Sequence, residues 1–430
     1  LQQETYKAIS AAGAAAFDCG LASTPAMFMS LIFPATKMDG AIMITASHLP
    51  SNRNGLKFFT TDGGLEKTDI LSILKTAASL PALEHTLCVS KLPLMQLYTA
   101  HLRQKICTGL SCPENSLPLA GLHIVVDAGN GSGGFFVKDV LQPLGADTSG
   151  SLYLEPDGMF PNHIPNPENK AAMQAIQTAV LTNKADLGLI FDTDVDRMSA
   201  VLSDGSDISR NSLIALTAAI LASDYPGSTI VTDSVTSDEL TDFLTQRLHL
   251  RHHRYMRGYK NVIDECIRLN EKGELSPLAI ETSGHGALKE NYYLDDGAYL
   301  AIKFIIAADK AKKAKHLLSE LIADLKQPAE SRAYRLQIKA SSDCQLYGQK
   351  ILEAVRQKAA QQKINEAMPS YEGIRLIFPE GWALLRLSLH DPNLPLNIES
   401  PQKGGAAKIA ARMRNLVAGF DFLDISPLND

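Results

Sequence analysis

Three aspartates that alternate with other residues follow an apolar run in the middle of the chain. The run Leu187–Phe191 leads into Asp192, Asp194 and Asp196, and Arg197 comes next. In an extended segment alternate side chains point to the same side, so these carboxylates can converge on one divalent cation, for which Mg²⁺ is the natural candidate. Without a cation, the carboxylates would raise one another's pKa. A solvated acidic turn is the alternative, and the apolar strand that delivers the loop weakens it.

A serine, a histidine and a lysine lie close together after another apolar run. The run Ala41–Thr45 precedes Ser47 and His48, and the turn signal Asn54-Gly55 precedes Lys57. A serine at the end of a strand, beside a histidine and a cation, is well placed to act as a nucleophile. Taken alone, the segment also fits a turn serine whose hydroxyl bonds to nearby backbone.

A glycine-rich loop gives the strongest competing hypothesis. The spacing G-x-G-x-x-G occurs between Gly129 and Gly134, after the strand-like run His123–Val126, and Glu155 lies about twenty residues further on. This arrangement is typical of dinucleotide sites and predicts an NAD-dependent oxidoreductase. Against it, Asp127-Ala128 separates the strand from the glycines, and the hypothesis leaves the serine and aspartate loops unexplained.

Two more polar loops follow strand-like runs. The first is Arg257-Gly258-Tyr259-Lys260, and the second is Glu281-Thr282-Ser283-Gly284-His285. Because Glu281 and Ser283 alternate, they can face one ligand, and a carboxylate with a hydroxyl can grip vicinal sugar hydroxyls. His285 can shuttle a proton near neutral pH. Each residue by itself also fits a loop residue bonded to backbone, and Lys260 fits a solvated surface charge.

The composition is that of a globular protein with several domains. The 430 residues are 45% hydrophobic and 20% charged, which excludes a disordered or fibrous class. The net charge of −6 argues against nucleic acid as a partner, although a local basic pocket for small anions is still allowed. No apolar run approaches the ~20 residues of a membrane helix, so we expect a soluble protein without a membrane partner.

The cysteines and the start of the sequence bear on its compartment. The six cysteines are scattered without a C-x-x-C pair, which indicates neither a disulfide framework nor a zinc ribbon. A reducing compartment, cytoplasm or plastid stroma, fits best. Because the sequence opens at Leu1 in what reads as the middle of a helix, we expect the first domain to be incomplete at its N-terminus.

Short β-branched runs alternate with longer helical patterns along the chain. This alternation indicates an α/β fold built from βα units with mostly parallel sheets, whose loops after the strands are favoured places for ligands. Breaks rich in glycine, proline and serine predict four domains, at residues 1–117, 118–227, 228–330 and 331–430. The last contains strands with few crossovers, among them Arg335–Ile338 and Trp382–Leu389, so we expect a smaller α+β domain there.

Four loops, in this order, resemble the signature loops of the α-D-phosphohexomutase superfamily, which contains phosphoglucomutases, phosphomannomutases and phosphoglucosamine mutases. Residues 45–57 resemble its T-A-S-H-N-P…N-G-x-K phosphoserine loop, and residues 192–197 resemble its D-G-D-G-D-R metal loop. Residues 257–260 resemble its G-F-K loop, and residues 281–285 resemble its E-x-S-G-H sugar-binding loop. The glycine-rich segment resembles the opening of the family's second domain, so the resemblance covers nearly the whole chain.

The resemblance implies a fold and a reaction. The fold would be three βα domains of mixed sheets and a smaller α+β domain around a central cleft. The enzyme would be an isomerase that interconverts hexose 1-phosphate and hexose 6-phosphate by Mg²⁺-dependent phosphoryl transfer, with hexose 1,6-bisphosphate as intermediate and activator. The implied site residues are catalytic Ser47, His48, Lys57 and His285; metal-binding Ser47, Asp192, Asp194 and Asp196; and substrate-binding Arg197, Gly258, Lys260, Glu281, Ser283, Arg386, Ser388 and His390.

The last domain departs from the family's R-x-S-G-T-x-P phosphate loop. Arg386 and Ser388 are kept, but Leu389 stands where glycine or asparagine is usual and His390 where threonine is usual. A bulkier residue hinders the close backbone approach that anion binding needs, and Asp391 adds negative charge. These changes, which also resemble a plastid branch of the mutases, favour a second hypothesis: a mutase-like protein with weak or no turnover that serves as a regulatory or structural partner.

Overall fold

The computed structural model describes residues 1–47, 49, 52–79, 88–113, 115–339, 343–388 and 391–429. The chain forms two compact units. The first unit comprises Leu1–Ile220 and Ser283–Leu321, and the second unit comprises Leu221–Thr282 and Ile322–Asp430.

The first unit begins with small sheets and four helices. Strand β1 (Ala16–Asp18) pairs in parallel with β5 (Val89–Lys91), and β2 (Ala41–Ile44), β3 (Leu56–Thr60) and β4 (Gly63–Gly64) form an antiparallel sheet. The helices are α1 (Gln2–Ala11), α2 (Thr24–Ile32), α3 (Lys67–Ala77) and α4 (Leu94–Gly109). Helix α2 starts where it does because the Ser23 side chain accepts a hydrogen bond from the Ala26 N–H and Pro25 lies in the first turn.

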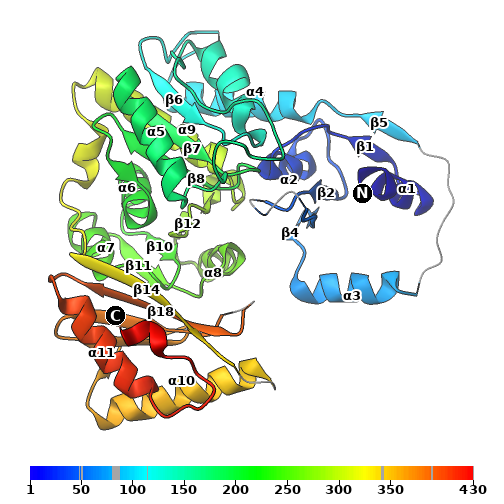
Figure 1. Cartoon of the computed structure of the whole chain (residues 1–430). Coiled ribbons are helices and arrows are strands. Elements are labelled where there is room, and N and C mark those ends of the chain that lie inside the picture. Colours follow the sequence, from blue (N-terminus) through cyan, green and yellow to red (C-terminus); the bar gives the residue numbers. More distant parts are fainter. Residues whose placement is uncertain are drawn as a thin grey trace. The chain divides into compact units, whose positions relative to one another are not determined.

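A mixed four-stranded sheet forms the core of the first unit. Its order is β6-β7-β8-β9, in which β6 and β7 are parallel and the other pairs are antiparallel. The strands are β6 (Ile124–Asp127), β7 (Leu187–Phe191), β8 (Met198–Leu202) and β9 (Asp207–Ile208). All residues of β6, β7 and β8 are buried because helices α5 (Lys170–Asn183) and α9 (Gly297–Lys313) pack against the sheet (Figure 1). Strand β7 has the predicted bounds. The sheet is mixed, as the family resemblance implied, and not mostly parallel as the alternation of strands and helices indicated.

The second unit contains a parallel set of strands and an antiparallel sheet. Strands β11 (Arg251–Arg254) and β12 (Leu278–Ile280) flank β10 (Thr229–Thr232) in parallel, and α8 (Tyr259–Glu271) packs against them. The antiparallel order is β14-β18-β17-β16-β15, with α10 (Cys344–Gln361) and α11 (Gly405–Val417) enclosing its apolar core. Its strands are β14 (Glu330–Gln337), β15 (Asn365–Glu366), β16 (Ile374–Phe378), β17 (Gly381–Leu385) and β18 (Asn393–Ser400).

The helical elements not yet named comprise one helix of 13 residues and several shorter ones. They are α6 (Arg210–Ala222), α7 (Asp238–Asp242) and single turns at Ser132–Gly134, Phe136–Leu141, Gln142–Leu144, Phe243–Arg247, Lys289–Asn291, Leu318–Ile322 and Ser426–Asn429. The α+β character expected for the last part of the chain agrees with its antiparallel sheet. The strand predicted at Trp382–Leu389 corresponds to β17, which ends at Leu385. Leu389 lies outside the described residues.

A buried arginine holds the antiparallel sheet to the parallel strands of the second unit. The Arg375 guanidinium lies 3.6 Å from the centroid of the Trp382 ring and donates to the carbonyls of Ser234 and Thr236. These two bonds come from Nη1, and the second terminal nitrogen, Nη2, donates to Asp238 Oδ1. Burial lowers the pKa of Arg375 to about 9, so these acceptors are needed to keep it charged at low cost.

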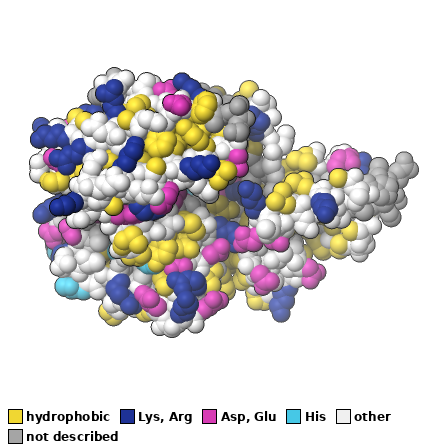
Figure 2. Space-filling view, turned by 90° about the horizontal axis from the view of Figure 1, so that it is seen from below, with side chains coloured by type: hydrophobic (Ala, Val, Ile, Leu, Met, Phe, Trp, Pro, Cys, Tyr) yellow, Lys and Arg dark blue, Asp and Glu magenta, His cyan; other side chains and the backbone are white. Residues whose placement is uncertain are grey.

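The surface carries mixed charge. Basic, acidic and apolar side chains are interspersed on the face drawn in Figure 2. In the part of the chain that the structure describes, none of the helices combines the length and the apolar character that crossing a bilayer requires.

A buried tyrosine ties α4 to the start of α9 in the first unit. The Tyr98 hydroxyl donates to Asp296 at 2.7 Å, and Asp296 caps α9 by accepting from the Tyr299 N–H. We expect Tyr98→Phe to lower the free energy of unfolding by about 1–3 kcal/mol, because a buried acceptor loses a donor. Urea unfolding would measure this, with Tyr292→Phe, whose residue is 55% exposed, as the control. Equal effects of the two substitutions would contradict the assignment.

Candidate active site

The aspartate loop joins β7 to β8 and buries all three of its carboxylates. Asp192, Asp194 and Asp196 are each at most 4% exposed, and an oxygen of each lies within 4.8 Å of an oxygen of the others. The carboxylates converge as predicted, but by a tight turn instead of an extended segment. Val195 adopts a φ of +64°, which is an outlier for a β-branched residue and stands where the family pattern has glycine.

The loop keeps this strained turn because its surroundings fix it. The Gly297 N–H donates to the Val195 carbonyl at 3.0 Å. A Cβ at Gly297 would lie 2.7 Å from the Arg197 carbonyl carbon, so only glycine fits there. From the other side, the Thr24 N–H donates to the Asp194 carbonyl at 2.9 Å, and the Thr24 hydroxyl donates to the Asp194 carboxylate at 2.6 Å.

Lys57 and Arg197 compensate the buried negative charge. Lys57 Nζ lies 2.9 Å from Asp194 Oδ2 and 2.8 Å from Asp196 Oδ2, and Arg197 Nε lies 3.1 Å from Asp192 Oδ2. Burial and the two neighbouring carboxylates hold the pKa of Asp192 well above its usual range. Burial also acts to raise the pKa of Asp196, but the charges of Lys57 and His285 outweigh it and lower that pKa.

The donor set fits a hard divalent cation. Asp194 Oδ1 and Asp196 Oδ1 are buried and accept no hydrogen bond from any described residue. An unsatisfied buried carboxylate oxygen is costly, so these atoms are suited to a further positive partner. Oxygen donors of this kind, clustered on one side of a loop, are the ligands that Mg²⁺ takes in proteins.

The serine loop brings Lys57 to these carboxylates through the hairpin of β2 and β3. Met43 pairs with Lys57, and the Thr45 N–H donates to the Gly55 carbonyl at 3.1 Å. Gly55 is needed because a Cβ there would lie 2.5 Å from the Thr45 carbonyl oxygen. Ser47 follows with a φ of +52°, a conformation uncommon outside glycine and enriched at functional sites. His48 lies outside the described residues.

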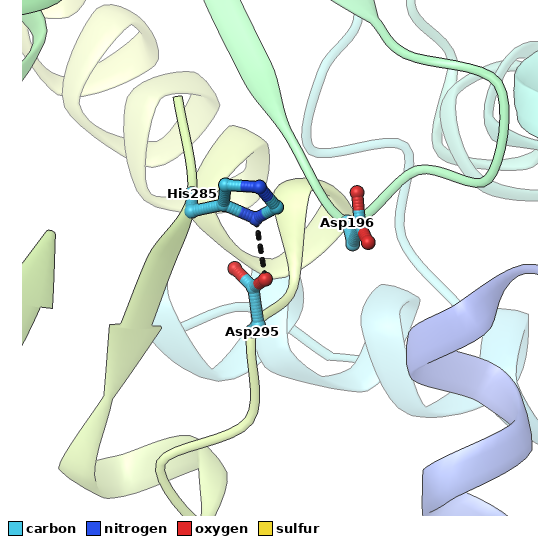
Figure 3. A group of neighbouring side chains, drawn as sticks. All are labelled: Asp196, His285 and Asp295. Atoms are coloured by element: carbon cyan, nitrogen blue, oxygen red, sulfur yellow. Dashed lines mark hydrogen bonds and ion pairs between the residues drawn. The ribbon is translucent and has the colours of Figure 1, made fainter. Parts of the chain in front are cut away.

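His285 is held beside the aspartate loop by Asp295, which the sequence prediction missed. His285 Nδ1 and Asp295 Oδ2 are 2.5 Å apart, and the Asp196 carboxylate lies next to them (Figure 3). Backbone bridging between Arg197 and His285 fixes the histidine against β8. Burial lowers the pKa of His285, but the charge and hydrogen bond of Asp295 outweigh it and raise that pKa.

The glycine-rich loop supports the aspartate loop. The Ser132 N–H and hydroxyl donate to the Thr193 carbonyl at 2.8 and 3.0 Å, and a Cβ at Gly131 would lie 2.6 Å from that oxygen. The N–H groups of Asn130 and Gly131 also donate to protein carbonyls. Glu155 pairs with Lys138 at 2.6 Å. These donors are therefore engaged within the protein, which argues against the dinucleotide hypothesis.

In the second unit the loops after the parallel strands form their own polar group. Gly258, at φ +113°, donates its N–H to Glu281 Oε1 at 2.7 Å, so these two predicted residues are together. Lys260 pairs instead with Asp264 at 3.2 Å on its own helix. Asp233, which the sequence prediction missed, accepts from the Thr282 hydroxyl at 2.7 Å and lies 3.7 Å from Arg257 Nε.

The predicted phosphate loop is partly described. Arg386 donates to Glu372 Oε1 at 3.4 Å, and the Ser388 N–H donates to the Asn393 carbonyl. His390 lies outside the described residues. Glu372 lies two residues before the start of β16 and gives no signal in the sequence that would have marked it.

Comparison with known proteins gives one consistent result. Residues 1–80, 96–205 and 209–327 match the families described as phosphoglucomutase/phosphomannomutase, alpha/beta/alpha domains I, II and III. A phosphomannomutase/phosphoglucomutase of Pseudomonas putida is 28% identical over 403 residues, which is 93% of this chain and 80% of that protein. Such relatives are isomerases, which agrees with the predicted enzyme class.

Solved structures agree with the family matches. A phosphoglucomutase/phosphomannomutase family protein of Burkholderia thailandensis has a TM-score of 0.77 and 25% identity, with 95% of this chain and 83% of that chain covered. Aspergillus fumigatus N-acetylphosphoglucosamine mutase, solved with GlcNAc-6P and magnesium, shares the fold at a TM-score of 0.55 and 14% identity, with 96% and 98% covered.

A buried ion pair beside the glycine-rich loop predicts a pH-dependent contribution to stability. His163 Nε2 lies 2.9 Å from Asp127 Oδ2, and His163 Nδ1 lies 3.0 Å from the Ile164 carbonyl. Burial lowers the pKa of His163, but Asp127 and the Ile164 carbonyl outweigh it, so the pKa is raised. The stabilisation is thus fully present below pH ~6.5 and is lost as the pH rises through the higher folded-state pKa.

His163→Gln should therefore destabilise the protein more at pH 6 than at pH 9. Urea unfolding of both proteins at the two pH values measures the difference. The exposed His316→Gln, whose side chain is 65% accessible, serves as the control. A destabilisation that is the same at both pH values would contradict the charged pair.

Proposed function

Because the chain belongs to the α-D-phosphohexomutase superfamily, we propose that it interconverts hexose 1-phosphate and hexose 6-phosphate through a phosphorylated Ser47. Hexose 1,6-bisphosphate is the proposed intermediate and activator. The observation that carries the proposal is the group of three buried carboxylates with Lys57 bonded to two of them. Burying three carboxylates costs free energy, and a bound cation would offset that cost.

Mg²⁺ is the proposed cofactor. Asp192, Asp194 and Asp196 would hold it together with an oxygen on Ser47. When bound, it would withdraw charge from the phosphoryl group and favour its transfer. The two buried oxygens without hydrogen bonds, on Asp194 and Asp196, support this assignment.

In the proposed reaction a sugar hydroxyl oxygen attacks the phosphorus on Ser47. A new O–P bond forms, the bond from phosphorus to Ser47 Oγ breaks, and the hydroxyl proton is passed on so that Oγ ends protonated. Lys57, an ammonium that donates to two carboxylates, is suited to supply a proton or positive charge. His285, oriented by Asp295, is suited to accept and return one.

The other predicted residues would bind the sugar phosphate. Glu281 and Ser283 would hold sugar hydroxyls, and the cations Arg197, Lys260 and Arg386 would contact phosphate with Gly258, Ser388 and His390. Catalysis would then come mostly from positioning and charge neutralisation, as a loose phosphoryl-transfer transition state requires.

The preferred sugar is best found by assay. The Pseudomonas relative is named for mannose and glucose phosphates, and the Aspergillus enzyme was solved with GlcNAc-6P. Coupled assays with glucose, mannose and glucosamine 1-phosphates, each with its bisphosphate activator, would rank the substrates. The second hypothesis, a regulatory or structural protein, rests on the changed residues Leu389 to Asp391. Absence of turnover on all three sugars would favour it.

Mg²⁺ should raise the melting temperature of the protein, because a ligand of the folded state adds about 2.7 kcal/mol of stability at a hundred times its Kd. Asp194→Asn removes one charged ligand and should weaken Mg²⁺ binding by at least about tenfold. Calorimetric titration measures the affinity. Asp204→Asn is the matched control, because Asp204 is exposed in a turn of the same unit. Equal Mg²⁺ binding by both variants would reject the site.

Ser47→Ala should reduce mutase turnover by at least about a thousandfold, because the acceptor of the phosphoryl group is removed. Mg²⁺ should still bind, since the three carboxylates are unchanged. Ser72→Ala, on the exposed side of α3, should leave turnover at the wild-type level. Near-normal turnover by Ser47→Ala would remove Ser47 from the mechanism.

A further inference from the structure

An internal carboxylate occupies a group of anion-binding donors in the second unit. Glu372 Oε2 accepts from the Ser234 hydroxyl at 2.5 Å and from the Arg257 N–H at 3.1 Å. Its other oxygen, Oε1, lies 3.4 Å from Arg386 Nη1. A hydroxyl, a backbone N–H and a guanidinium are donors of the kind that bind phosphate oxygens. We call Ser234, the Arg257 N–H and Arg386 the donor group.

The charges around the donor group are balanced by Glu372. The cations Arg257 and Arg386 are accompanied by the carboxylates Asp233 and Glu372, and the Arg257 side chain lies near Asp233. Only 13% of the Glu372 side chain and 11% of the Arg386 side chain are accessible, so their attraction is poorly screened by solvent. Asp233 accepts a hydrogen bond from the Thr282 hydroxyl, and Glu372 is the carboxylate that accepts from Arg386.

Arg386 is not fully satisfied by Glu372. The contact of 3.4 Å is long for a charge-assisted hydrogen bond, and it uses only one guanidinium nitrogen. Arg386 Nε is buried and has no hydrogen-bond partner among the described residues. A guanidinium group binds best when it donates two parallel hydrogen bonds to one anion. Arg386 makes a single long contact with Glu372, so it can still donate to the oxygens of a phosphate.

We propose that Glu372 is an internal competitor for phosphate, which occupies the donor group and sets the affinity and specificity of the protein for phosphorylated ligands. A phosphate dianion offers three acceptor oxygens to the same donors and must replace or approach the Glu372 carboxylate. The charge of Glu372 therefore opposes phosphate binding. The identification of the biological ligand as a sugar phosphate rests on the proposed function, whereas the competition itself does not.

Glu372→Gln tests the proposal because it removes the charge and keeps the shape and an acceptor oxygen. We expect the variant to bind inorganic phosphate severalfold more tightly than the wild type in calorimetric titrations at fixed ionic strength, without divalent cations. Glu366→Gln is the matched control, because Glu366 pairs with Arg356 at 3.0 Å elsewhere on the same antiparallel sheet. It should bind phosphate like the wild type.

Ser234→Ala gives the opposite expectation, because it removes a donor and leaves the competing carboxylate. It should bind phosphate more weakly than the wild type. If Glu372→Gln does not fold, the phosphate affinity of Ser234→Ala tests the proposal instead. Equal or weaker phosphate binding by Glu372→Gln would overturn the proposal and make Glu372 a structural tie. Wild-type affinity in Ser234→Ala would overturn it as well.

The outcome is separable from that of the proposed function. Tighter phosphate binding by Glu372→Gln in a protein without mutase turnover would sustain the competition and reject the reaction. Normal turnover with an unchanged phosphate affinity in Glu372→Gln would sustain the proposed reaction and reject the competition. With an active enzyme, we also expect Glu372→Gln to lower KM for hexose 1-phosphate more than it changes kcat.

Discussion

The ion pairs of Lys57 with Asp194 and Asp196 are the interaction on which the first unit's site depends. Three carboxylates buried at the end of β7 would repel one another and resist ionisation without positive partners. Lys57, delivered by the β2–β3 hairpin, supplies one charge, and Arg197 supplies another beside Asp192. The contact also ties β3 to the aspartate loop, and Ser47 follows β2, the strand that pairs with β3.

Close backbone approach is the second requirement of this arrangement. The aspartate loop is enclosed by backbone at Gly131 and Gly297, where a Cβ would lie within 3 Å of the loop. This enclosure holds Val195 in a conformation that it would not adopt by itself, at a cost of order 1–3 kcal/mol. Strain, buried charge and oxygens without hydrogen bonds coincide in six residues, which is what distinguishes this loop from an ordinary acidic turn.

Part of the fold and the clustering of the three aspartates could be predicted from the sequence. Strand β7 and the convergence of Asp192, Asp194 and Asp196 followed from an apolar run and its polar continuation. The partners that orient these groups could not be predicted, because Thr24, Asp295 and Glu372 carry no local signal. Thr24 and Glu372 also act across long stretches of chain, on Asp194 and Ser234. The glycine-rich segment shows the converse: its spacing fits a dinucleotide loop, and only the contact of Gly131 with Thr193 reveals its supporting role.

We propose that Ser47 carries a phosphoryl group and that its transfer depends on the buried carboxylate cluster. The most direct measurement is mass spectrometry of peptides from protein incubated with hexose 1,6-bisphosphate and Mg²⁺, followed by addition of hexose 1-phosphate with or without a chelator. The account predicts one phosphoryl group on the peptide that contains Ser47, and its discharge to the sugar only when Mg²⁺ is present. A phosphoryl group on another residue, or discharge that is equally fast with the chelator, would contradict it.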